Sequence, residues 1–110
     1  LFDRKLTELM DSFIQQIFLI NDAEVHNSFH QLKSFFSYHS NEELLHAYNL
    51  VQFIYYLYFY SEEKAQYYCN LVLQNRTIYS NKYLSILHIF VAKHYVIYTR
   101  EFCGIFSKNC

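Results

Sequence analysis

Hydrophobic residues recur along most of the chain at the three- and four-residue spacing of an α-helix. In the first segment the apolar positions that share one helical face are Leu6, Met10, Phe13, Ile17 and Ile20. The segment 25–36 repeats this spacing. The segment 42–60 starts amphipathic and becomes apolar nearly all round after Leu50. A helix that is apolar all round needs neighbours on several sides, so this one is predicted to be central.

Three further helices are predicted over residues 65–73, 78–98 and 100–106. β-Strands are the alternative for the Val-, Ile- and Tyr-rich stretches 52–60 and 86–91. Helices are favoured because these stretches belong to apolar windows of about 20 residues, whereas ordinary strands end after about five or six.

Polar and acidic clusters indicate where helices begin. Asp22, Asn41 and Ser61 each place a short acceptor side chain before acidic first-turn residues, which favours the free backbone amides and the helix dipole. Only short polar joints separate successive helices, such as 21–22, 40–41 and 74–77. Joints of this length force neighbouring helices to lie antiparallel.

A repeat organises these helices into pairs. The second helix of each pair is predicted to begin near Asp22, Ser61 and Thr99, at intervals of about 39 and 38 residues. Two helices per period of this length are typical of tetratricopeptide and armadillo/HEAT solenoids. We therefore expect an all-α fold of antiparallel helix pairs, a short tetratricopeptide-like α-solenoid that forms a single domain over residues 1–110. An irregular helical bundle is the alternative.

Composition restricts the function classes. The 110 residues include 12 Tyr and 11 Phe but one Gly and no Pro, which excludes disorder and leaves little for hairpin turns or phosphate-binding loops. A net charge of −1 disfavours direct binding of nucleic acid. The longest apolar run, 53–60, is far shorter than the ~20 residues that span a membrane. Three cysteines, an odd number, favour a reducing cytoplasm. Because Leu1 stands where Met is usual, we expect a fragment of a longer protein.

The histidines and cysteines are the candidates for metal binding or nucleophilic chemistry. His26 and His30 have the spacing of two metal ligands, but no third ligand follows them. A thiol of Cys69 or Cys103 could pair with an imidazole at position 88 or 94 as nucleophile and base. No Gly-rich turn beside either thiol supplies an oxyanion hole. We expect neither a metal nor a cofactor, and no enzymatic activity.

A stripe of polar and amphipathic residues runs along one side of the first helix in each predicted pair. Steps of three and four keep each stripe on one side of its helix. In a solenoid the first helices line the concave surface, so the stripes are expected to form one groove, where amides bond a ligand's backbone and Tyr rings stack. Gln52 and His88 support this because they lie inside otherwise apolar helices, where a buried polar group needs a partner. Simple exposure to water is the alternative. The candidate ligand-binding residues are Asn49, Gln52, Tyr56, Ser85, His88 and Tyr95.

Five consecutive stretches carry a resemblance to a known family: the Leu- and Tyr-rich run 44–60, the segment SEEKAQYY at 61–68, LVLQNR at 71–76, the run 79–98, and Gly-Ile-Phe at 104–106. In order and composition they resemble the C-terminal regulatory domain of Rgg-type transcriptional regulators, which sense peptide pheromones in Gram-positive bacteria. The resemblance covers residues 13–106 and contains no invariant motif.

The resemblance implies a tetratricopeptide-type domain that forms a homodimer and binds a short hydrophobic signal peptide in its concave groove. It also implies that DNA is bound only through a separate helix-turn-helix domain, which this chain does not contain. The expected function is therefore a peptide-binding and dimerising regulatory domain in quorum sensing, located in the cytoplasm. The alternative is a structural protein–protein interaction scaffold with no small ligand, which would use its Tyr-rich face.

Overall fold

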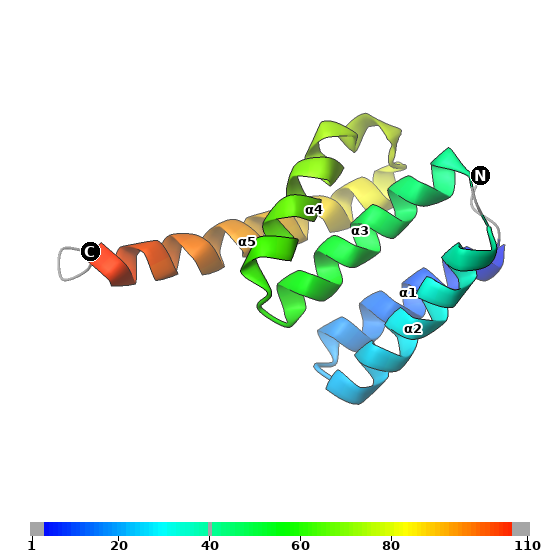
Figure 1. Cartoon of the computed structure of the whole chain (residues 1–110), viewed down its shortest axis with the longest axis horizontal. Helices are drawn as coiled ribbons and strands as arrows, with labels where there is room; N and C mark the ends of the chain where they lie inside the picture. The colour runs from blue at the N-terminus through cyan, green and yellow to red at the C-terminus, as the bar shows by residue number, and fades with distance from the viewer. Residues whose placement is uncertain (1–3, 40, 107–110) are drawn as a thin grey trace. The chain divides into compact units, whose positions relative to one another are not determined.

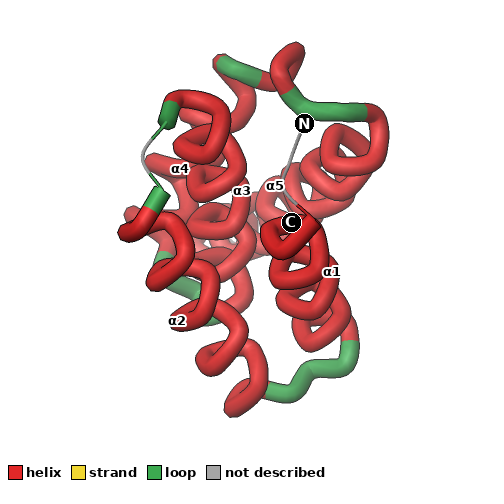
Figure 2. The backbone as a smooth tube through the Cα atoms, turned by 90° about the vertical axis from the view of Figure 1, so that its right-hand side faces the viewer, coloured by secondary structure: helices red, strands yellow, loops and turns green. Residues whose placement is uncertain are grey.

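The computed structural model describes residues 4–39 and 41–106, with side chains as far as Tyr98. These residues contain five α-helices and no strand (Figures 1 and 2), so the all-α prediction is confirmed. The stretches 52–60 and 86–91, for which strands were the alternative, lie largely or wholly inside helices. The helices are α1 (Arg4–Phe18), α2 (Asp22–Tyr38), α3 (Glu42–Tyr58), α4 (Glu62–Gln74) and α5 (Asn81–Phe106), with a short 3-10 helix, η1 (Arg76–Ile78), before α5.

The chain forms two compact units, Leu1–Asn75 and Arg76–Cys110. In the first unit α1 packs against α2 and α3 packs against α4, while α2 and α3 join the two pairs. The helices of each pair run antiparallel (Figure 1), as the short joints predict. The second unit consists of η1 and α5. The single-domain assignment stays a prediction.

Both helix pairs of the first unit turn in the same way. Ile20 and Tyr60, which stand 40 positions apart, have positive φ angles of 56° and 58° and so adopt the left-handed conformation. The hydrogen bonds that close the turns run from Ile20 N to Ile17 O (3.1 Å), from Asn21 N to Gln16 O (3.2 Å), from Tyr60 N to Leu57 O (3.1 Å) and from Ser61 N to Tyr56 O (2.9 Å). This is the Schellman pattern of helix ends. The predicted repeat is therefore present in the first two pairs.

The predicted third pair is not formed. α5 is continuous from Asn81 to Phe106, so no second helix begins near Thr99, and the segment 100–106 extends α5 instead of starting a sixth helix. The sequence around Thr99 explains the difference. Residues 96–103 contain no Asn, Asp, Gly or Pro that would end one helix and start the next. A solenoid of three helix pairs within this chain was thus a wrong prediction.

The structure modifies two of the three predicted helix starts. Asn41 caps α3 as predicted, since its side-chain oxygen accepts a hydrogen bond of 2.9 Å from the amide of Leu44. α2 is capped by Asn21, whose oxygen accepts from Glu24 N at 3.3 Å, and not by Asp22. Ser61 occupies the N-cap of α4 without a side-chain bond. Asp22, one position inside α2, instead accepts a hydrogen bond from the hydroxyl of Tyr58.

The core of the first unit is built from the predicted apolar faces. α3 supplies the largest share, as expected for the central helix. Ile20 is an exception: it was predicted to share the buried face of the first helix, but it follows the end of α1 and is 75% exposed. The largest fully buried side chains of this unit are Leu6, Met10, Phe13, Val25, Leu32, Leu50, Val51, Phe53, Ile54 and Val72.

The Tyr58–Asp22 bond predicts a loss of stability in alkaline solution. The pKa of Tyr58 is raised from 10.0 to about 12, mainly by the hydrogen bond to Asp22 and to a smaller extent by burial. Because the raised pKa belongs to the folded state, this stabilisation is complete below pH 10 and is lost as the pH rises toward 12. We expect the free energy of unfolding, measured by urea titration, to fall across this interval. The free energy of unfolding of the Tyr58→Phe variant should fall less steeply over the same pH interval. Equal slopes for the variant and the unchanged protein would contradict a stabilising role of this hydrogen bond.

Candidate functional site

Two of the predicted binding residues on α3 meet a tyrosine of α4. The Gln52 side-chain amide donates a hydrogen bond of 2.9 Å from Nε2 to the hydroxyl of Tyr68. The Tyr56 ring stacks on the Tyr68 ring, with centroids 5.8 Å apart and an angle of 14° between the planes. Asn49, the third α3 residue of the predicted set, is only 8% exposed and therefore lies in the core.

Tyr48 extends this cluster by one further turn of α3. Burial is the largest cause that raises the pKa of Tyr48, and the neighbouring phenol groups of Tyr56 and Tyr68 raise it further. Three tyrosine side chains and one amide thus form a half-buried surface, defined here as the tyrosine strip: Tyr48, Gln52, Tyr56 and Tyr68. Tyr48 was not among the predicted residues, although its spacing of four and eight residues from Gln52 and Tyr56 was visible in the sequence.

Side chains of the two second helices flank the tyrosine strip. From α2, Phe36 stacks on Tyr48 with centroids 4.7 Å apart, and Phe29 meets the edge of Tyr56 at 6.3 Å. From α4, the Lys64 ammonium lies 5.0 Å from the centroid of the Tyr56 ring, a cation–π contact. The sequence predicted a groove lined by first helices. The α3 stripe lies instead between α2 and α4, because the more apolar face of α3 is the one that packs into the core.

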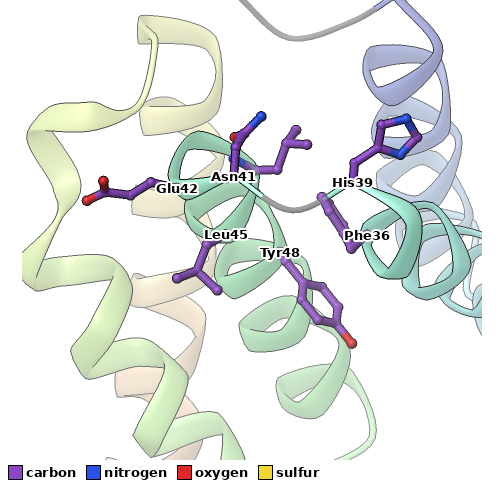
Figure 3. A pocket seen from close by; sticks show the side chains of 7 residues that line it. Phe36, His39, Asn41, Glu42, Leu45 and Tyr48 are labelled. Atoms are coloured by element: carbon purple, nitrogen blue, oxygen red, sulfur yellow. The ribbon is translucent and has the colours of Figure 1, made fainter.

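A pocket of about 440 Å³ lies at the connection between α2 and α3. Figure 3 shows the side chains that line it, Tyr48 among them. Tyr48 belongs to both the strip and the pocket. The volume lies within the range of small-ligand pockets, at its lower end. The pocket is lined by Phe36 and His39 from α2 and its C-cap, and by Asn41, Glu42, Leu44, Leu45 and Tyr48 from the N-cap and first turns of α3.

His26 takes part in aromatic packing. Its ring stacks on Phe59 with centroids 4.4 Å apart, and its Nδ1 shares a hydrogen bond of 2.7 Å with the hydroxyl of Tyr55. His30, four residues later, lies edge-on to Phe29. Within the described part of the chain, no three His, Cys, Asp or Glu side chains are placed to hold a metal ion.

The thiol of Cys69 is in an unreactive environment. Cys69 is 4% exposed, and burial raises the pKa of its thiol. A raised pKa keeps the thiol protonated and therefore a poor nucleophile. The side chains of Cys103 and Cys110, the other two cysteines, lie outside the described residues.

The remaining predicted binding residues lie on one exposed face of α5, in the second unit. Ser85, His88 and Tyr95 are all exposed, Tyr95 to 68%. The Ser85 hydroxyl donates to the Asn81 carbonyl at 2.9 Å within the same helix. The expectation that His88 is buried among apolar residues was wrong, because the buried side chains of α5 lie on another face: Tyr83, Leu87, Phe90 and His94.

No helix among the described residues has both the length and the apolar character that crossing a bilayer requires. In comparisons with known proteins, no family model, no curated protein and no solved structure matches the chain significantly.

Proposed function

We propose that this chain is a peptide-binding and dimerising regulatory domain of a bacterial transcriptional regulator, and that a short hydrophobic signal peptide binds along the tyrosine strip. One observation carries the proposal. Aromatic faces and polar atoms of α3 and α4 share a half-buried strip that continues into the pocket between α2 and α3. Few sites combine apolar area with polar groups that orient a backbone, and short peptides need both.

Each group of the strip has a role in this proposal. Gln52 donates to Tyr68 through Nε2, so its side-chain oxygen remains to accept a hydrogen bond from a peptide amide. The ring of Tyr56 offers apolar area, and the pocket beside Tyr48 accepts one apolar side chain. Lys64 supplies a positive charge for a peptide carboxylate at the far end of the strip.

Binding on the strip would act on the arrangement of the helix pairs. The strip and the side chains beside it come from α2, α3 and α4, and α2 and α3 belong to different pairs. A peptide that contacts all three helices binds one arrangement of the two pairs better than others. This difference in affinity shifts the population of arrangements, which is how a ligand regulates.

α5 carries the features proposed for the homodimer. Ser85, Ile89, Ala92 and Val96 are exposed and follow the alternating four- and three-residue spacing of a coiled-coil seam. Ile89 and Val96 are 52% and 50% exposed, so both could supply apolar area to this seam. In this proposal DNA is bound by a separate domain and the protein acts in the cytoplasm. The resemblance to Rgg-type regulators supports both statements.

Peptide binding can be tested with a library of fluorescently labelled heptapeptides rich in Leu, Ile and Phe, followed by fluorescence anisotropy. We expect some of these peptides to bind and to raise the melting temperature of the chain. Gln52→Ala and Tyr56→Ala should each weaken binding about tenfold, the loss of roughly 1.4 kcal/mol. Gln66→Ala is the matched control, since Gln66 bonds only an exposed neighbour, Asn70, in α4.

The outcome depends on affinity and helicity together. Circular dichroism should show unchanged helicity in all of these variants, and a loss of helicity in Gln52→Ala would assign this residue to the core. If no peptide binds, or if Gln66→Ala weakens binding as much as Gln52→Ala, the strip is not a peptide site.

The second candidate function is a protein–protein interaction scaffold with no small ligand. Exposed tyrosines favour it: Tyr38, Tyr60 and Tyr67 are 82%, 69% and 59% exposed. Tyrosines are common at protein interfaces because the ring is apolar while the hydroxyl stays hydrated. A scaffold would depend on these side chains, and no short apolar peptide would raise its melting temperature.

A further inference from the structure

The turns that close the two helix pairs expose large apolar side chains. Phe18, Leu19 and Ile20 follow one another at the first turn and are 57%, 63% and 75% exposed, and Tyr60 at the second turn is 69% exposed. These four residues are defined here as the turn surface. It shares no residue with the tyrosine strip. Contiguous exposed apolar residues of this kind mark interaction sites.

The two turns lie side by side at one end of the first unit (Figure 1). Two contacts hold them together. The hydroxyl of Tyr58, at the end of α3, donates to Asp22 at the start of α2. The ring of Phe59 stacks on His26 with centroids 4.4 Å apart. The apolar side chains of both turns are therefore presented from one supported end of the helix pairs.

The backbone at two positions of the turn surface favours glycine. Ile20 and Tyr60 have positive φ angles, which glycine adopts without strain and which a β-branched residue such as isoleucine adopts only with strain. A residue before an N-cap can pack on the fourth helical residue as a hydrophobic staple, here Val25 for Ile20. Ile20 nevertheless remains three-quarters exposed. Packing within the chain therefore does not account for a large apolar side chain at either position.

Acidic residues border the turn surface. Asp22 and Glu24 begin α2, Glu62 and Glu63 begin α4, and all four are exposed. The segments 15–24 and 55–63, which form the two turns, contain no Lys or Arg. The nearest following cation, Lys64, is directed over the ring of Tyr56 on the tyrosine strip. An apolar surface with a negative border complements a partner that is apolar and positively charged.

We propose that the turn surface docks a basic amphipathic helix of a partner protein. The apolar face of that helix packs on Ile20 and Tyr60 and their apolar neighbours, while its Lys and Arg side chains pair with the carboxylates at the border. The negative border would repel an anionic lipid surface. This interaction goes beyond peptide binding on the tyrosine strip and does not depend on it.

The proposal can be tested with the full chain and a fluorescein-labelled 18-residue peptide of Leu and Lys in an amphipathic helical pattern. We expect this probe to bind, and a Leu/Glu peptide of the same pattern not to bind. The double variant Ile20→Gly/Tyr60→Gly should weaken binding at least tenfold. It should remain folded, because glycine suits both backbone positions. Glu62→Gln/Glu63→Gln should weaken binding several-fold and reduce its dependence on salt.

Matched controls lie at the opposite ends of α2 and α3. Tyr38→Ala removes an aromatic side chain that is 82% exposed, and Glu43→Gln removes an exposed carboxylate from the first turn of α3 that does not line the pocket. Both should leave the affinity for the Leu/Lys peptide unchanged. The proposal is overturned if these controls weaken binding as much as the turn variants, if the glycine double variant binds normally, or if the Leu/Glu peptide binds equally well.

Two further measurements distinguish other occupants of the same surface. Sedimentation of the chain with phosphatidylcholine vesicles, abolished by Ile20→Gly/Tyr60→Gly, would assign the turn surface to lipid. Self-association measured by analytical ultracentrifugation and abolished by the same variant would assign it to a second copy of the chain. Either result would replace the basic helix as the partner, and we expect neither.

Discussion

Phe53→Ala is expected to destabilise the first unit by about 3 to 5 kcal/mol. Phe53 is fully buried in α3, the helix that packs on α4 and joins the two pairs through α2. Removing the ring forfeits its burial and leaves a cavity that rigid neighbouring helices fill only in part. Domains of this size have a free energy of unfolding of about 5 to 15 kcal/mol. The substitution therefore removes a large part of the stability of the folded state. Urea unfolding followed by circular dichroism measures the change.

An exposed phenylalanine provides the comparison for this prediction. Phe18 is 57% exposed at the end of α1, so Phe18→Ala should change the free energy of unfolding by less than about 0.5 kcal/mol. The large difference between two identical substitutions would show that α3 is the centre of the first unit. A cost of less than about 1 kcal/mol for Phe53→Ala would contradict the packing described for this helix.

Glycine at the two left-handed positions is expected to stabilise the chain, although most substitutions destabilise proteins. Ile20 and Tyr60 each adopt a positive φ angle that costs a non-glycine residue about 1 kcal/mol. Both side chains are mostly exposed, so little packing is lost with them. We expect Ile20→Gly and Tyr60→Gly each to add about 0.5 to 1 kcal/mol to the free energy of unfolding. Thermal unfolding should shift upward by several degrees.

Leu19→Gly is the matched control for this gain. Leu19 is a neighbouring apolar residue that is 63% exposed, but its φ angle is not positive. Glycine there relieves no strain and increases the entropy of the unfolded chain, so it should destabilise by a few tenths to 1 kcal/mol. If Leu19→Gly and Ile20→Gly change stability equally and in the same direction, the left-handed turn is not the cause.

The local features of this fold were predictable because they depend on neighbouring residues. Helical spacing and short polar joints placed the four helices of the first unit, and Asn41 was recognised as a cap. Ile20 was misplaced because it continues the apolar spacing of α1 past the end of the helix. A Schellman turn without glycine carries no sequence signal. Thr99 was wrongly predicted to start a helix because the prediction used only its spacing from Ser61. No helix-breaking residue stands beside Thr99, and α5 continues through it.

The candidate site was predictable only where it depends on one helix. Gln52 and Tyr56 share a face of α3 by spacing alone, and the structure brings them together at Tyr68. Tyr68 itself was missed, because pairing across α3 and α4 depends on how the two helices pack. His88 was expected to be buried because its sequence neighbours are apolar. Burial instead follows the face of α5 that carries Leu87 and Phe90.

A nuclear magnetic resonance titration shows directly whether the tyrosine strip binds an apolar peptide. The chain, labelled with nitrogen-15, is titrated with the heptapeptide that binds most tightly in the anisotropy screen. If the peptide binds there, we expect chemical-shift changes to concentrate at Tyr48, Gln52, Tyr56 and Tyr68 and in the first turns of α3 that line the pocket. Changes confined to the turn surface or to α1, with these residues unmoved, would contradict it.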